Sequence, residues 1–104
     1  MHVRTIENLD STKGHPYITR ANLRQQLGIS LASIDIRVRE IKKEVENGRY
    51  TDLAVIKDGG IVLINYLVFI DYEKNRQKLL EPNLRKYVEP FNPREVAENM
   101  GWYN

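Results

Sequence analysis

TRANLRQQLG (residues 19–28) and ISLASIDIRVREIKKEV (residues 29–45) together predict two helices joined by a very short turn. In the first segment, Thr19 suits the N-cap position, and Leu23 and Leu27 recur four residues apart, as on one face of a helix. Gly28 is expected to end this helix, because glycine accepts the left-handed conformation that is common after a helix C-terminus. The first helix is therefore expected from about residue 19 to residue 27.

The second segment has the strongest helical periodicity in the chain. Ser30 is a suitable N-cap, and Asn47-Gly48 is a suitable end. Between them, apolar residues recur at spacings of three and four, namely Leu31, Ile34, Val38, Ile41 and Val45. Because so few residues separate the two helices, they must cross at a wide angle, as in a helix-turn-helix.

A β-hairpin is predicted after these helices. Two β-branched segments, residues 53–56 and 61–64, flank Lys57-Asp-Gly-Gly60, and a tight turn needs residues that tolerate positive φ. Helix, turn, helix and hairpin in this order are typical of a winged helix-turn-helix, in which the second helix enters the major groove of DNA.

Two further helices are predicted after the hairpin. Asn65 is a suitable cap for a helix that runs to about Leu80. Residues 87–91 are expected to form an extended, proline-containing connector. Asn92-Pro-Arg-Glu95 then has the cap, proline and glutamate of a helix start, and this last helix is expected to end near Gly101.

The expected fold class is mainly α with a small β-hairpin (α+β), a winged helix-turn-helix with extra C-terminal helices. Three segments are expected along the chain. Residues 1–16 form a flexible lead-in, residues 17–64 form the winged helix-turn-helix, and residues 65–104 form a C-terminal helical extension that packs on it.

Composition narrows the possible environment and partners. The 104 residues include no cysteine, so disulfides and thiolate metal sites are excluded. The N-terminal segment has no apolar core of a signal peptide, and residues 61–70 are too short and too interrupted to span a bilayer. We therefore expect a cytoplasmic protein without a membrane partner. The net charge is only +2, but residues 15–49 hold seven Lys and Arg against four Asp and Glu.

The outward face of the second helix is the predicted DNA-binding surface, and it carries Ser33, Ile36, Arg37, Glu40 and Lys43, with Arg39 on its flank. Ser33 and Arg37 would meet base edges, and Ile36 would touch a thymine methyl group. Lys42, Lys43 and Arg49 lie further along and suit phosphates. The full candidate set adds the start of the first helix, the second N-cap and the wing tip: Thr19, Arg20, Asn22, Ser30, Ser33, Ile36, Arg37, Arg39, Lys42, Lys43, Arg49 and Lys57.

The same residues have a purely structural interpretation. The cations of the second helix would then form a solvated face, with Arg37 paired to Glu40 and Glu44 along the helix. Ile36 would pack within the protein or against another subunit, and Lys57 would be a turn charge without a partner.

A second functional hypothesis is a protein-interaction module of phage origin that binds or inhibits a host protein. It rests on the modest net charge and on Met100-Gly-Trp-Tyr103, an aromatic end that a DNA reader does not need. A homodimer is also expected, because helix-turn-helix proteins commonly pair to match two half-sites. The helix from Tyr66 to about Leu80, or the C-terminal tail, would supply its surface.

An enzyme is not expected, and neither is a cofactor or a metal. His2 and His15 lack partners at ligand spacing, and the chain has no Walker loop, GxGxxG or HExxH motif. Asp71 and Glu73 are expected to make ordinary surface pairs. The aromatic residues Tyr66, Phe69 and Tyr72 are expected in the core and not as a platform for stacking bases.

Four stretches carry a family resemblance: Arg39-Glu-Ile-Lys42, Glu46-Asn-Gly-Arg-Tyr50, residues 56–72 and residues 85–94. Through them, residues 17–101 resemble small winged-helix, excisionase-like DNA-binding proteins of phages and mobile elements in Gram-positive bacteria. The chain is more distantly similar to MerR-type winged helices, in which the strand leaving the wing also enters a helix through a polar cap, as Ile64-Asn65 does here. The resemblance implies a bacterial cytoplasmic protein that binds double-stranded DNA as an architectural factor for excision or a transcriptional regulator.

Overall fold

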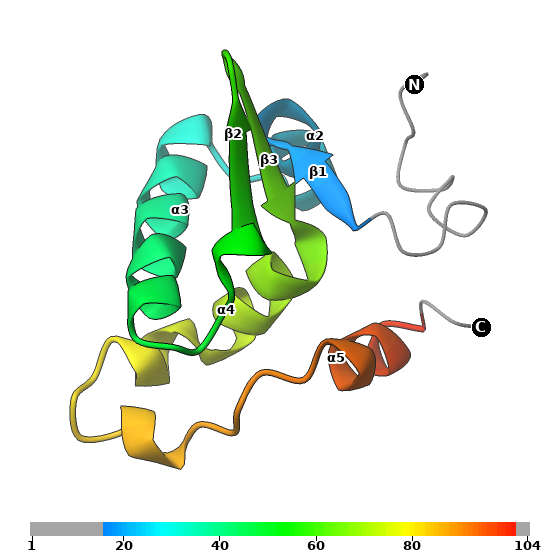
Figure 1. Cartoon of the computed structure of the whole chain (residues 1–104). Coiled ribbons are helices and arrows are strands. Elements are labelled where there is room, and N and C mark those ends of the chain that lie inside the picture. Colours follow the sequence, from blue (N-terminus) through cyan, green and yellow to red (C-terminus); the bar gives the residue numbers. More distant parts are fainter. Residues whose placement is uncertain (1–15, 102–104) are drawn as a thin grey trace.

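The computed structural model describes residues 16–101, which fold into a small antiparallel sheet with helices packed against it (Figure 1). The α+β class is therefore confirmed. The elements, in chain order, are β1 (Tyr17–Thr19), α2 (Arg20–Leu27), α3 (Leu31–Glu46), the 3₁₀ turn η2 (Asp52–Ala54), β2 (Val55–Asp58), β3 (Ile61–Asn65), α4 (Tyr66–Leu79), the 3₁₀ turn η3 (Arg85–Tyr87) and α5 (Pro93–Asn99).

The helix starts follow the local signals of the sequence. Oxygen atoms of the Thr19 and Ser30 side chains accept hydrogen bonds from backbone N–H groups in the first turns of α2 and α3. Asn65 and Asn92 do the same for α4 and α5. All four predicted N-caps are confirmed. The stop at Gly28 is confirmed too, since this residue has φ of +69°.

The sheet has the strand order β1-β3-β2, and both pairs are antiparallel. The predicted hairpin is present: Asp58 pairs with Ile61, and Gly59 has φ of +61° in the loop between them. The third strand, β1, was not predicted, because three residues are too few to show alternation. The Pro16 carbonyl accepts a hydrogen bond from the Tyr66 N–H (2.6 Å), so this end of the predicted lead-in is tied to α4. The rest of the lead-in lies outside the described residues.

One hydrophobic core joins the sheet to α2, α3 and α4. Its fully buried side chains come from every one of these elements: Leu23, Ile34, Ile41, Ile64, Phe69 and Tyr72. The core positions predicted for Tyr66, Phe69 and Tyr72 are confirmed. However, α4 is not an added extension, because Phe69 and Tyr72 complete the same core as α3. The predicted boundary at residue 65 therefore cuts through the folded unit.

The segment between α4 and α5 contains a 3₁₀ turn and then contacts the core. The predicted extended connector is shortened by η3, and the Phe91 ring then packs edge-on against Tyr50, with ring centroids 5.1 Å apart. α5 packs against α4 and buries Ala97. In Figure 1 this helix lies well apart from α3.

Across residues 16–101, no helix combines the length and the apolar character that crossing a membrane requires.

Candidate nucleic-acid interface

The solvent-facing stripe of α3 is centred on Arg39. Its exposed residues recur at spacings of three and four: Ala32, Ile36, Arg39, Lys43 and Glu46. Ile36 and Lys43 thus lie on the outward face, as predicted, and Arg39 lies in its middle and not on its flank. The observed outward face is rotated by part of a helical turn from the predicted one. Arg37 and Glu40, which were predicted to face outward, instead bond to residues of α4 and are half-buried.

Arg37, which was predicted to contact base edges, is bonded to other residues of the protein. Its Nε donates to the carboxylate of Glu73 on α4, and its Nη1 donates to the Ser33 carbonyl oxygen (3.2 Å). Only 18% of its side chain is exposed. A free Arg37 at the leading end of α3 was therefore a wrong expectation, because sequence spacing does not show a partner 36 residues away.

The carboxylates along the flanks of α3 are each paired with an arginine from another element. Arg20 on α2 makes a bidentate bond to Asp35, with both distances 2.8 Å. Arg76 on α4 binds Glu40 in the same way (2.8 and 3.0 Å). Arg85 binds Glu44 at 3.0 and 2.9 Å. The expected pairing of Arg37 with Glu40 and Glu44 is thus replaced by pairs between elements.

These pairs affect the titration of Glu40. The hydrogen bond from Arg76 lowers the pKa of the Glu40 carboxyl below its ordinary value, although burial opposes the change. A hydrogen bond donated by Tyr72 (2.8 Å) supports the charged carboxylate as well. Glu40 is therefore a neutralised, structural anion and not part of a free acidic surface.

Pairing the carboxylates with distant arginines leaves three cations of α3 without a counter-charge. Within residues 16–101, Arg39, Lys42 and Lys43 form no ion pair. Glu46 is the one acidic residue of α3 that also lacks an ion pair in this part of the chain. The outward face of α3 is consequently cationic.

Strand β2 adds a further cation to this face. The side chains of Lys42 on α3 and Lys57 on β2 lie close together, and the proximity of Lys57 lowers the pKa of Lys42, with burial adding to the effect. We call Arg39, Lys42, Lys43 and Lys57 the basic face. The sequence identified all four as candidates but did not show that two lysines fifteen positions apart form one site.

Arg49 does not belong to this face. Its side chain is only 10% exposed and binds the buried carboxylate of Asp71 (2.8 Å). It also donates to the Glu89 carbonyl oxygen (2.7 Å), and Tyr50 donates to the same Asp71 oxygen (2.6 Å). The predicted phosphate contact of Arg49 is therefore wrong, because the guanidinium holds the connector before α5 against the core. Asp71 is likewise buried and not an ordinary surface residue.

The remaining candidates lie around the start of the two helices. Thr19 caps α2 and Arg20 is paired with Asp35, while Asn22 is half-buried beside this cap. The Ser30 hydroxyl caps α3 and donates to the Ser33 hydroxyl oxygen (3.1 Å). Thr19, Arg20 and Ser30 thus have partners within the protein, so this region supplies fewer free donors than the sequence suggested.

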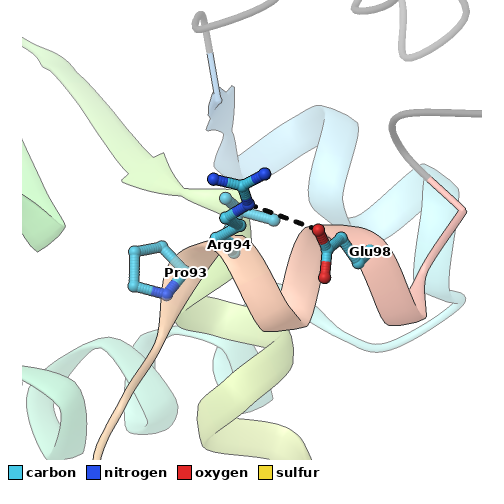
Figure 2. A pocket seen from close by; sticks show the side chains of 4 residues that line it. Pro93, Arg94 and Glu98 are labelled. Carbon is cyan, nitrogen blue, oxygen red and sulfur yellow. Dashed lines mark hydrogen bonds and ion pairs between the residues drawn. The ribbon is translucent and has the colours of Figure 1, made fainter.

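A hollow of about 390 Å³ borders the basic face, between α3 and the end of α4. It is lined by Ile36, Arg39, Lys43, Tyr72 and Leu80, among others. Figure 2 shows a different hollow, between α4 and α5, where Arg94 bonds to Glu98 (3.3 Å) beside Pro93. Arg94 is 82% exposed there, and the bond is an ordinary surface pair.

No group of three or more His, Asp or Glu side chains that could hold a metal gathers in residues 16–101. His2, His15 and the aromatic tail at residues 102–104 lie outside the described residues. The other predicted dimer surface, the apolar side of α4, is occupied by the protein's own core.

Comparisons of the chain with models of known protein families, with curated proteins and with solved structures find no match.

Proposed function

We propose that this protein binds double-stranded DNA as a winged helix-turn-helix, with α3 in the major groove and the β2–β3 hairpin beside it as the wing. The observation that carries the proposal is the basic face. Its four cations come from both α3 and β2, and none of them has an acidic partner within the described residues.

Phosphate is the partner that best fits such a surface. Two ammonium groups held together repel each other, and an anion placed between them relieves that repulsion. An α-helix fits the width of the major groove, and cations on its exposed side then reach the backbones that line the groove. The neutralised pairs at Asp35, Glu40 and Glu44 keep most of the negative charge of α3 away from the duplex.

The shape of the hairpin supports the same orientation. It projects from the body as a narrow ribbon (Figure 1). Gly59 and Gly60 at its tip carry no side-chain bulk, and a Cβ at either position would meet nothing within 4 Å. This tip can therefore approach a backbone or a minor groove closely.

The test is the affinity for a labelled duplex, measured by fluorescence anisotropy over a range of salt concentrations. Arg39→Ala and Lys43→Ala should each weaken binding and lower the slope of log K against log salt by about 0.9, the value for one phosphate contact. Arg94→Ala is the matched control, because it removes an exposed cation far from α3. Binding that is insensitive to salt, or equally weakened by all three variants, would contradict the proposal.

The biological role that we propose follows the resemblance noted in the sequence: an excisionase-like architectural factor or a transcriptional regulator of a phage or mobile element in the bacterial cytoplasm. The genes beside the coding sequence discriminate the two. An adjacent integrase gene favours excision, whereas replication genes favour regulation of early phage development.

A protein-interaction module is the second candidate, and one observation favours it. Leu80, Leu84 and Tyr87 all expose large apolar side chains within the short segment that follows α4. Leu84→Asp should then abolish capture of a host or phage protein from a nuclease-treated lysate and leave DNA affinity unchanged. Partners that disappear after nuclease treatment would instead support DNA binding.

A further inference from the structure

The half of α3 that precedes the basic face exposes apolar side chains. From Leu31 to Arg37, the exposed residues are Ala32 and Ile36, which lie one turn apart on the outward stripe. Ile36 is 40% exposed, so its side chain is accessible to a partner that contacts this face. This apolar spot is continuous with the basic face through Arg39, which lies one turn further along.

The polar side chains in the same half of α3 are already engaged. Arg37 is bound to Glu73, and Asp35 is bound to Arg20. The Ser33 hydroxyl accepts a hydrogen bond from Ser30. Hydrogen-bond readout of base edges by these side chains would therefore require breaking existing bonds, whereas contact through Ile36 requires no rearrangement.

The major groove presents one apolar group at base edges, the C5-methyl group of thymine. We propose that Ile36 reads thymine through this methyl group, so that the protein prefers A·T pairs where the first half of α3 meets the groove. The inference rests on the proposed function, because it needs α3 to enter a major groove. The cations would then supply affinity, and Ile36 would supply the preference for sequence.

The experiment isolates the methyl group from every other property of the base. Affinity is measured for the alternating duplexes d(AT)n and d(AU)n, which differ in the thymine methyl groups and keep the same hydrogen-bonding pattern. A second pair, d(GC)n and its 5-methylcytosine form, adds a methyl group at the equivalent position. We expect the uracil duplex to bind about fourfold more weakly per methyl group in contact, the value of one buried methyl group. The methylated G·C duplex should bind more tightly than d(GC)n.

Ile36→Ala shows whether the preference belongs to this residue. The variant should lose the difference between the thymine and uracil duplexes and keep its affinity for the uracil duplex. Tyr87→Ala, which truncates another exposed large apolar side chain outside α3, should keep the full difference. Circular dichroism is the check that both variants are folded. Both side chains are exposed, so we expect their truncation to leave the fold intact.

The outcomes separate this inference from the proposed function. Equal affinity for the thymine and uracil duplexes, together with weaker binding by Arg39→Ala and Lys43→Ala, overturns the reading of thymine and leaves DNA binding intact. A thymine preference that survives in Ile36→Ala also overturns it. Failure of every duplex to bind overturns both proposals.

Discussion

Asp71 is the residue on which the most buried polar contacts converge. Its carboxylate receives hydrogen bonds from Arg49 and Tyr50, and both charged side chains of the pair are at most 10% exposed. Asn75, one turn further along α4, donates to its other oxygen (3.3 Å). This cluster connects the loop after α3 to the middle of α4, and through Glu89 to the connector before α5.

Replacing Asp71 by alanine should therefore destabilise the protein strongly. The Arg49 guanidinium would remain buried without its counter-charge, which costs about 3–5 kcal/mol of unfolding free energy. The measurement is urea denaturation followed by circular dichroism. Glu98→Ala is the control, because it removes the carboxylate of an exposed pair and should cost less than about 1 kcal/mol. Similar losses for both variants would show that the Asp71 cluster is not a buried pair in solution.

Arg37 offers a test of the proposed DNA binding through a substitution at its partner Glu73, which would not touch the duplex. In Glu73→Gln the guanidinium loses its charged partner and becomes available to a phosphate. We expect tighter binding and a salt slope steeper by about 0.9, at a stability cost of roughly 0.5–1 kcal/mol. Anisotropy titration and urea denaturation measure the two effects.

The matched control is the double variant Glu73→Gln/Arg37→Ala, which should lose the gain in affinity. An unchanged affinity in Glu73→Gln alone would mean that the bond to the Ser33 carbonyl oxygen is sufficient to hold Arg37 in place.

Single residues also show which contacts can be predicted from the sequence. The caps at Thr19, Ser30 and Asn65 bond to groups two or three residues away, so their residue type and position were enough to predict them. The partners of Arg37 and Arg49 lie far along the chain, and nothing in the local sequence identifies them. The cationic character of the candidate interface was therefore predictable, but which cations remain free was not.

At the scale of elements, α3 is stabilised by the N-cap at its first turn. The Ser30 hydroxyl accepts from the Ser33 N–H (3.1 Å) and satisfies one of the donors that a helix start leaves unpaired. Ser30→Ala should cost about 1 kcal/mol of unfolding free energy. Ser33→Ala removes only the contact between the two hydroxyls and should cost much less in the same denaturation experiment. Equal costs would show that the cap contributes nothing.

The elements themselves were largely visible in the sequence. The period of α3, the glycine turn of the hairpin and the Asn92-Pro93 start of α5 all gave the right boundaries to within a few residues. β1 was missed because its three residues pair with β3, a segment more than forty positions away. α4 was placed correctly but assigned to the wrong unit, because local pattern does not show whose core an apolar face completes.

For the whole molecule, we expect alkaline pH to weaken the fold by titration of buried tyrosines. Burial raises the pKa of Tyr50, and the hydrogen bond it donates to Asp71 adds to this effect. Burial and a hydrogen bond donated to Glu40 raise the pKa of Tyr72 as well. The folded protein thus holds these protons more tightly than the unfolded chain, in which tyrosine has a pKa of 10.0.

The sign of the pH dependence follows from this difference. The stabilising contribution of both tyrosines is fully present below pH 10.0 and is lost as the pH rises above it. Each tyrosine should remove about 1.4 kcal/mol of unfolding free energy per pH unit in that range. Burial raises the pKa of Tyr66 too, so three tyrosines contribute to the slope. Urea denaturation at several alkaline pH values measures this slope, and Tyr72→Phe should reduce it by about a third. A slope that the substitution leaves unchanged would assign alkaline sensitivity to other groups.

The long-range arginine pairs that flank α3 have a consequence for the kinetics of the proposed complex with DNA. Arg20 holds one side of the helix to α2, and Arg76 and Arg85 hold the other side to α4 and the segment after it. A helix fastened in this way enters a complex in the shape it already has, so little ordering entropy is lost on docking. The association rate constant would then be set mainly by electrostatic steering between the basic face and the duplex. Different DNA sites would therefore differ mainly in the dissociation rate constant, that is, in the lifetime of the complex.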